Sequence, residues 1–292
     1  CFMKSMKIIT SPGDTQRLSN GLPIPGIGYG TYLAPADTSG TRSILDALEA
    51  GYRLIDTASV YGNEKTVGRA VRESSIPREE IFITSKVWNT DQGYESTLSA
   101  FDASLNRLET DYLDLYLIHW PIPAGYEKDY KELNRETWKA MERLYKEGQA
   151  RAIGVSNFLP RHLEALMEQA DTIPMVNQLE INPRYHQTEA VAFCREHGIL
   201  VESWGPLARG GVLEEPVLRR IADKHKKSVA QICLRWELQR GIVPLPKSVH
   251  ADRIKANLDV FGFSLDGEDM ALIDTLDAPG HSSIHPDHLS EE

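Results

Sequence analysis

The chain has 292 residues, of which 41% are hydrophobic and 25% are charged, and its formal net charge is −10 at pH 7. This composition is typical of a globular protein with a substantial core, and the negative charge argues against general nucleic-acid binding. The three cysteines, Cys1, Cys194 and Cys233, form no CxxC pair, so we expect no disulfide framework and no zinc site, in a reducing, cytoplasmic setting without membrane spans.

The first predicted elements are two short extended runs, Lys7–Thr10 and Leu22–Pro25. Turn residues at positions 11–14 and 19–21 separate them, and this pattern predicts a hairpin. We expect residues 1–6 to lie outside the folded domain, as a disordered or non-native segment.

From residue 26 onward, short apolar runs alternate with helical patterns. The runs are rich in Ile, Val and Leu, as in strands that are buried on both faces. The predicted strands are Gly26–Tyr32, Leu54–Ala58, Ile81–Val87, Leu113–His119, Ile153–Ser156, Val176–Ile181, Leu200–Trp204 and Ile242–Pro246. The predicted helices are Thr38–Ala50, Glu64–Glu73, Tyr94–Leu108, Tyr130–Gly148, Pro160–Ala170, Thr188–His197, Pro216–His225, Ser228–Arg240, His250–Asp259 and Leu265–Leu276.

Eight strands that are each followed by a helix predict an α/β fold of the (β/α)₈ TIM barrel type. No linker, low-complexity tract or longer repeat interrupts the pattern, so we expect residues 1–292 to form one barrel domain. The hairpin would precede the barrel, and residues 277–292 would form a short C-terminal tail over the surface.

Polar side chains lie at the ends of several predicted strands, where active sites of parallel barrels are found. Asp56, Lys86 and His119 end the second, third and fourth strands, and Tyr61 follows Asp56 on the same loop. A buried lysine is costly unless it is paired, and Asp56 on the neighbouring strand is its natural partner. A purely structural ion pair, a helix-capping Asp56 and ordinary loop packing of Tyr61 are the alternative interpretations.

These four residues together indicate a reaction class. A free phenol has a pKa of about 10 and is a poor acid near neutrality. We expect the ammonium of Lys86, held by Asp56, to lower the pKa of Tyr61 and make it a usable proton donor to a carbonyl oxygen. His119 would bind the same oxygen. An acid without an adjacent nucleophile or metal fits carbonyl reduction, with the hydride supplied from elsewhere.

No G-x-G-x-x-G motif follows a strand, so a Rossmann site is not predicted, and the glycine-rich run 26–30 is expected to serve tight backbone packing. Other residues fit a nicotinamide cofactor across the barrel top. Amides would hold the carboxamide, an indole would stack on the ring, a glycine-rich loop would cover the pyrophosphate, and cations would bind a phosphate. These residues are Asn157 and Gln178 for the carboxamide, Trp204 for the ring, the 205–211 loop for the pyrophosphate, and Lys247, Ser248 and Arg253 for the phosphate. Core amides, a packed indole, a surface loop and solvated cations are the plain alternatives.

The chain resembles the aldo-keto reductases over nearly its whole length. The bacterial branch with 2,5-diketo-gluconate reductases and broad aldehyde or methylglyoxal reductases is the most similar. The segments that carry the resemblance occur in the family's order and on the matching strands: Gly51–Glu64, Ile83–Asn89, Leu113–Pro121, Ile153–Phe158, Asn177-Gln178 and Ile242–Ser248.

The resemblance implies an NADPH-dependent enzyme that reduces a small-molecule carbonyl substrate and acts as a monomer. From the net charge and the lack of a long apolar run, we expect neither a nucleic-acid nor a membrane partner. The resemblance also implies a catalytic tetrad of Asp56, Tyr61, Lys86 and His119. Cofactor contacts are implied for Ser156, Asn157, Gln178, Trp204, Gly205, Pro206, Leu207, Lys247, Ser248, Arg253 and Asn257. Substrate contacts are implied for Trp88, Trp120 and Tyr29. Ala256 stands where many relatives have Glu, so adenine binding is expected to differ in detail.

Two other functions are alternatives. A cofactor-binding, non-catalytic regulatory barrel subunit would not need all four groups of the tetrad, which this chain has. A metal-assisted isomerase would need His, Asp and Glu at ligand spacing, and no such cluster is seen in the sequence.

Overall fold

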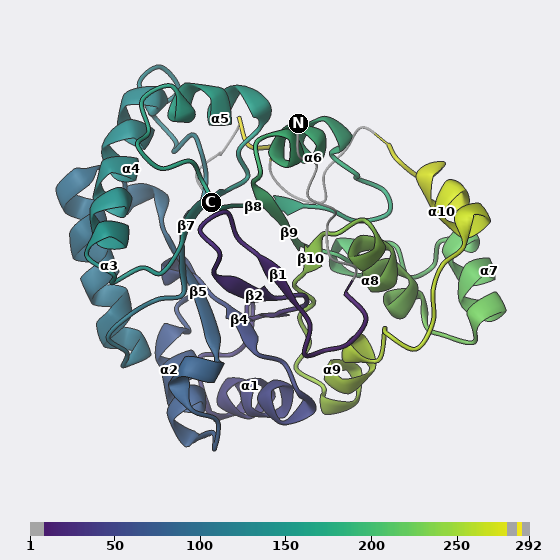
Figure 1. Cartoon of the computed structure of the whole chain (residues 1–292). Helices are drawn as coiled ribbons and strands as arrows, with labels where there is room; N and C mark the ends of the chain where they lie inside the picture. Colours follow the sequence, from purple (N-terminus) through teal and green to yellow (C-terminus); the bar gives the residue numbers. More distant parts are fainter. Residues whose placement is uncertain (1–8, 279–284, 288–292) are drawn as a thin grey trace.

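The structure is a computed structural model, and it describes residues 9–278 and 285–287. A curled sheet of eight parallel strands lies at the centre, and helices surround it (Figure 1). Strands that follow one another in the chain are neighbours in the sheet, from β3 to β10. The predicted (β/α)₈ architecture is therefore confirmed.

The sheet and helix boundaries agree with most of the predicted ranges. The strands of the sheet are β3 (Tyr29–Gly30), β4 (Leu54–Asp56), β5 (Phe82–Val87), β6 (Leu115–Ile118), β7 (Ile153–Ser156), β8 (Val176–Glu180), β9 (Leu200–Trp204) and β10 (Val243–Pro244). The α-helices are α1 (Thr38–Ala50), α2 (Glu64–Glu73), α3 (Tyr94–Leu108), α4 (Tyr130–Lys146), α5 (Pro160–Met167), α6 (Thr188–Glu196), α7 (Pro216–His225), α8 (Val229–Gln239), α9 (Ala251–Leu258) and α10 (Gly267–Asp274). Short 3-10 helices are η1 (Ser59–Tyr61), η2 (Arg78–Glu80), η3 (Asn89–Asp91) and η4 (Ala208–Gly210).

The central strands are rich in apolar residues because both of their faces are covered. Every residue of β4, β5, β6, β7 and β8 is buried. One face meets the barrel interior and the other meets the helices, and each fully buried aliphatic side chain contributes about 1.5–3 kcal/mol. Polar residues within these strands therefore need partners inside the barrel.

Backbone hydrogen bonds close the barrel between its first and last strands. The N–H of Gly28 donates to the carbonyl of Pro244 at 3.0 Å, and the N–H of Gly30 donates to the carbonyl of Pro246 at 3.1 Å. A Cβ on Gly28 would lie 2.5 Å from Cδ2 of Leu245, and a Cβ on Gly30 would lie 2.9 Å from the carbonyl oxygen of Leu245, so both positions of the seam favour glycine. The glycine-rich run thus serves backbone packing, as predicted.

An antiparallel hairpin of β1 (Thr15–Arg17) and β2 (Pro23–Pro25) precedes the barrel and lies in front of the ring's centre in Figure 1. The prediction of its second strand is confirmed, but the first was wrong: Ile9 and Thr10 form no strand, and residues 1–8 lie outside the described residues. Ile9 is instead buried in the core, and Gln16 pairs with Ile24. The side chain of Asn20 donates to the carbonyl of Arg151, just before β7, so the hairpin covers the amino ends of the strands.

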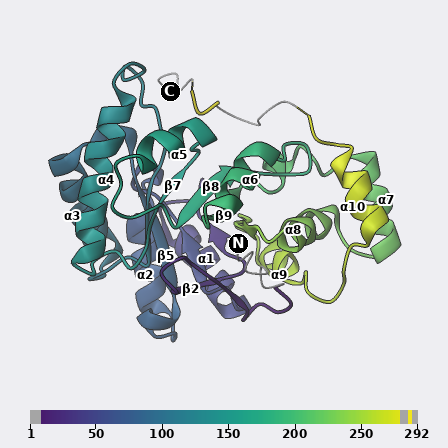
Figure 2. The ribbon, with the colours of Figure 1, turned by 45° about the horizontal axis from the view of Figure 1, so that its top comes forward.

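Two C-terminal segments pack outside the barrel. Helix α10 lies beside α7 (Figure 2), where Lys224 donates to Asp266 at 2.7 Å and to Asp269 at 2.8 Å. In the described part of the tail, Asp287 pairs with Arg161 and lies 3.1 Å from Nε2 of His162, on α5. Over the described residues, no helix has the length and apolarity needed to cross a membrane.

Candidate active site

The predicted tetrad converges at the carboxyl ends of β4, β5 and β6. Asp56 ends β4, Lys86 lies in β5, and His119 directly follows β6. Tyr61 ends η1, the single 3-10 turn that follows β4. Its ring centre is 5.6 Å from that of His119 and 5.1 Å from the ammonium nitrogen of Lys86. The four side chains therefore form one cluster on the face opposite the hairpin.

Lys86 and Asp56 form a buried ion pair. The Lys86 ammonium lies 2.7 and 2.8 Å from the two carboxylate oxygens of Asp56 and donates to the carbonyl of Thr57 at 3.0 Å. Burial alone would lower the pKa of Lys86, but the charge of Asp56 and its hydrogen bonds outweigh burial and raise that pKa. Lys86 consequently remains a cation at neutral pH, as predicted.

The environment of Tyr61 corrects one expectation. Burial raises the pKa of Tyr61, and the positive charge of Lys86 lowers it by less, so the net pKa is above that of a free phenol. The Lys86 effect has the predicted sign, but desolvation of the phenolate is larger. The Tyr61 hydroxyl therefore stays protonated at neutral pH, which is the state a proton donor must have.

His119 is a buried, neutral imidazole. Burial and then the charge of Lys86 hold the pKa of His119 well below its usual value. Its Nδ1 has no hydrogen-bond partner among the described residues, and the indole of Trp88 packs edge-on at 5.1 Å between ring centres. A buried polar atom without a partner is unusual, and it favours a bound polar group at this position.

The predicted carboxamide-binding residues are linked to one another. Asn157 has a left-handed backbone with φ of 65°, and its amide donates to the carbonyl of His119 at 3.0 Å. The indole N–H of Trp204 donates to Oδ1 of Asn157 at 2.9 Å, and Ser156 donates to the carbonyl of Gln178. The Asn157 amide thus ties together the ends of β6, β7 and β9, and its oxygen has one acceptor position left.

Gln178 and Glu202 connect the tetrad to β8 and β9. Nε2 of Gln178 donates to Oδ2 of Asp56 at 2.8 Å and to Oε2 of Glu202 at 2.9 Å. Glu202 was not among the predicted site residues. Its position in the sequence could have identified it, because an acidic residue in the interior of an apolar strand must find a partner inside the barrel.

The predicted substrate contacts have different outcomes. Trp88 and Trp120 both lie against His119, with ring centres 5.1 and 6.4 Å away. Tyr29, however, points to the helix layer: it is 1% exposed, and its hydroxyl donates to the carbonyl of Ser248 at 2.5 Å. Successive residues of a strand face opposite sides, and glycines 28 and 30 take the inner side. This burial argues against the expected substrate contact of Tyr29.

Two further aromatic and cationic side chains lie at the mouth of the site and were not predicted. The ring centre of Tyr32 is 5.1 Å from that of Tyr61, and Tyr32 remains 45% exposed. The guanidinium of Arg209, from η4, lies 5.9 Å from the centre of the Tyr32 ring. Arg209 has φ of 53°, and the loop before it turns at Gly205 with φ of 64°. Only three-dimensional structure brings the loops after β3 and β9 together here.

The predicted phosphate-binding residues surround the start of α9. Lys247 and Arg253 are exposed, and no ion pair involves either of them within residues 9–278 and 285–287. Ser248 is buried, and its hydroxyl oxygen accepts from the N–H of His250, while Asn257 is buried further along the helix. Two cations without anionic partners beside a helix amino end suit a phosphate group.

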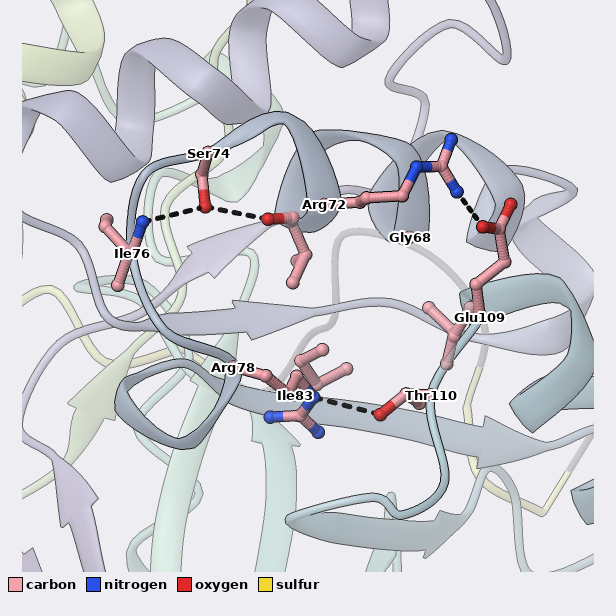
Figure 3. Close-up of a pocket in the computed structure, with 10 residues that line it drawn as sticks. Gly68, Arg72, Ser74, Ile76, Arg78, Ile83, Glu109 and Thr110 are labelled. Carbon is pink, nitrogen blue, oxygen red and sulfur yellow. Dashed lines mark hydrogen bonds and ion pairs between the residues drawn. The ribbon is translucent and has the colours of Figure 1, made fainter.

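A separate pocket of about 310 Å³ lies at the amino end of β5 (Figure 3). In it, Arg72 pairs with Glu109, and Arg78 donates to Thr110 at 3.0 Å. Because chemistry in such barrels is found at the carboxyl ends of the strands, we do not assign the site to this pocket.

Comparisons with known proteins find similar sequences and structures over most of the chain. The model of the "Aldo/keto reductase family" matches residues 26–278. A glyoxal reductase from Bacillus subtilis is 50% identical over 280 residues, which cover 96% of this chain and 99% of that protein. The crystal structure of an aldo/keto reductase from Brucella melitensis is 49% identical with a TM-score of 0.85, covering 90% of this chain and 99% of the other. The crystal structure of a Gox0644 mutant in complex with NADPH is 39% identical with a TM-score of 0.88, and the match covers 99% of this chain and 100% of the other.

Proposed function

Because this chain belongs to the aldo/keto reductase family, we propose that it reduces aldehydes or small ketones to alcohols with NADPH, and that Tyr61 donates the proton. The single observation that carries the proposal is the Lys86–Asp56 ion pair beside the protonated Tyr61 hydroxyl at the mouth of the barrel. We infer that the described residues act as one domain.

The residues at the barrel mouth fit NADPH, which when bound would supply the hydride. The exposed part of Trp204 would stack on the nicotinamide, and Ser156, Asn157 and Gln178 would hold its carboxamide. Lys247, Ser248 and Arg253 would bind the 2′-phosphate, since both cations lack anionic partners within the described part of the chain. Gly205, Pro206 and Leu207 would cover the pyrophosphate, with Asn257 near the adenine.

Tyr61 can act as the acid although its pKa is raised. A developing alkoxide is close to hydroxide in basicity and is a far stronger base than a phenolate, so it can take the proton from the Tyr61 hydroxyl. Lys86 stabilises the phenolate that is left behind, and Asp56 keeps Lys86 in place. Neutral His119 would bind the carbonyl oxygen and align it with the Tyr61 hydroxyl.

Small dicarbonyls and aromatic aldehydes are the substrates that we propose. The walls of the site nearest to His119 are the indoles of Trp88 and Trp120, which suit flat apolar groups. The relative from Bacillus subtilis is named for glyoxal reduction. The aldehyde carbon would then lie between the indoles and the Tyr61 hydroxyl.

The test is a spectrophotometric assay of NADPH consumption with glyoxal, methylglyoxal and aromatic aldehydes. We expect turnover with wild-type protein and nearly none with Tyr61→Phe, while NADPH still quenches the tryptophan fluorescence of both. Tight NADPH binding without turnover of any carbonyl by the wild-type protein would instead support a non-catalytic cofactor-binding subunit. Normal turnover by Tyr61→Phe would refute the role of Tyr61.

A further inference from the structure

Glu202 is a buried carboxyl group that the proposed chemistry does not use. It lies on β9 with 0% exposure, and its Oε2 accepts the hydrogen bond from Gln178. Its Oε1 has no hydrogen-bond partner among the described residues. Such a group inside a barrel is costly to retain, and a role in the site would account for it.

Gln178 joins this carboxyl group to the tetrad. One amide nitrogen donates at 2.9 Å to Glu202 and at 2.8 Å to Asp56. Since an amide nitrogen has two hydrogens, these two bonds use both of them and fix the orientation of the side chain. Asp56 in turn accepts from Lys86, so a continuous chain of hydrogen bonds runs from β9 to β5.

Burial raises the pKa of Glu202 by more than the charge of Lys86 lowers it, and no cation of the described residues forms an ion pair with its carboxyl group. The groups that face it are Asp56 from β4, Lys86 from β5 and Gln178 from β8. The Lys86 ammonium donates to Asp56 and to the carbonyl of Thr57. Burial, and then the charge of Asp56, raise the pKa of Glu202 to about 8. At neutral pH, Glu202 is therefore mostly a neutral acid.

We propose that Glu202 is a positioning residue that, as a neutral acid, holds the Gln178 amide against Asp56 and thereby keeps the Asp56 carboxylate fixed beneath Lys86. The kinetic part of this proposal rests on the proposed function. The protonation state of Glu202 and its bond to Gln178 do not, because they concern the free protein.

Ionisation of Glu202 has a defined consequence. It places a second negative charge beside Asp56, and this charge stabilises the protonated form of Tyr61 further. The same charge attracts the Lys86 ammonium, which would otherwise stabilise the Tyr61 phenolate. Proton donation from Tyr61 then becomes less favourable, so kcat falls. The aldehyde does not contact Glu202 directly in this account, so KM for the aldehyde changes less than kcat.

The chain provides a matched control on the other side of β9. Glu237, on α8, is also 0% exposed, and burial raises its pKa to about 8 as well. It accepts a hydrogen bond from Ser203, the residue after Glu202, so it faces the helix layer instead of the barrel interior. If titration of any buried carboxyl group lowered activity, Glu237→Gln would lose part of the pH dependence, whereas an effect on the site will be lost in Glu202→Gln alone.

The first experiment follows the carboxyl carbons of the cofactor-free protein by NMR with ¹³C-labelled glutamate between pH 5 and 9.5. We expect two resonances to titrate near pH 8, one absent from Glu202→Gln and the other absent from Glu237→Gln. A Glu202 resonance that titrates below pH 6 would overturn the proposal, whether or not the protein reduces carbonyls.

The second experiment measures kcat and KM over the same pH range. With a pKa near 8, about one Glu202 in ten remains neutral at pH 9, so kcat of the wild type and of Glu237→Gln should fall roughly tenfold from pH 7 to pH 9. The kcat of Glu202→Gln, whose amide stays neutral, should change less than threefold over the same range. A Glu202→Gln profile that matches the wild type would overturn the proposal, as would a loss confined to KM.

Discussion

Replacement of Lys86 by Met tests the buried ion pair beneath Tyr61. The substitution keeps the length of the side chain but removes the charge that neutralises Asp56. The Asp56 carboxylate is only 4% exposed, and Gln178 would be its remaining side-chain donor within the described residues. Removal of one partner of a buried pair typically costs about 3–5 kcal/mol, because the other charge is left uncompensated. For a domain of this size, that cost corresponds to a fall in Tm of roughly 10 °C.

The assay is thermal unfolding followed by circular dichroism, for Lys86→Met, Asp56→Asn and the double variant. The double variant should lose less unfolding free energy than the two single variants lose together, by about 2 kcal/mol, since it buries no unpaired charge. The surface pair between Arg42 and Asp46 provides the control, and Arg42→Met should cost less than about 1 kcal/mol. Single losses below 1 kcal/mol, or strict additivity in the double variant, would refute the reasoning.

Three further predictions concern other parts of the molecule. The raised pKa of Glu237, about 8, means that the folded state binds a proton that the unfolded state releases near pH 4.5, so stability falls as pH rises towards 8. Glu237→Gln should flatten the decline in Tm between pH 5.5 and 8, and an unchanged slope would contradict this. Arg253→Ala should weaken NADPH binding roughly tenfold and leave NADH binding unchanged, as measured by fluorescence quenching; equal losses for both would exclude a phosphate contact. Gly28→Ala should destabilise the barrel seam by about 1–3 kcal/mol, whereas Gly13→Ala, where a Cβ meets nothing within 4 Å, should be neutral in urea unfolding.

The tetrad could be located from the sequence because parallel strands in a barrel bring their carboxyl ends to one face. Asp56, Lys86 and His119 each follow an apolar run, and these runs are neighbours in both sequence and sheet. The same reasoning located the glycine seam, where the pattern of glycines on a strand already indicated close backbone approach.

Other features depended on information that a linear pattern does not hold. Both faces of β3 are buried, so the residue pattern did not show that the Tyr29 side chain points to the helix layer. The net pKa of Tyr61 depends on the balance between burial and the charge of Lys86, which requires coordinates. The contact of Tyr32 with Tyr61 joins two loops whose relative position the sequence does not specify. Predictions of a monomer and of a cytoplasmic location stay predictions.

The central claim is that the Tyr61 hydroxyl supplies the proton to the substrate. Stopped-flow measurement of the first turnover, with saturating NADPH and methylglyoxal at pH 7, compares wild-type protein with Tyr61→Phe most directly. The account predicts that Tyr61→Phe slows the loss of NADPH absorbance by roughly 10²–10⁴-fold, with NADPH affinity within about twofold of wild type. A first turnover at the wild-type rate would contradict it.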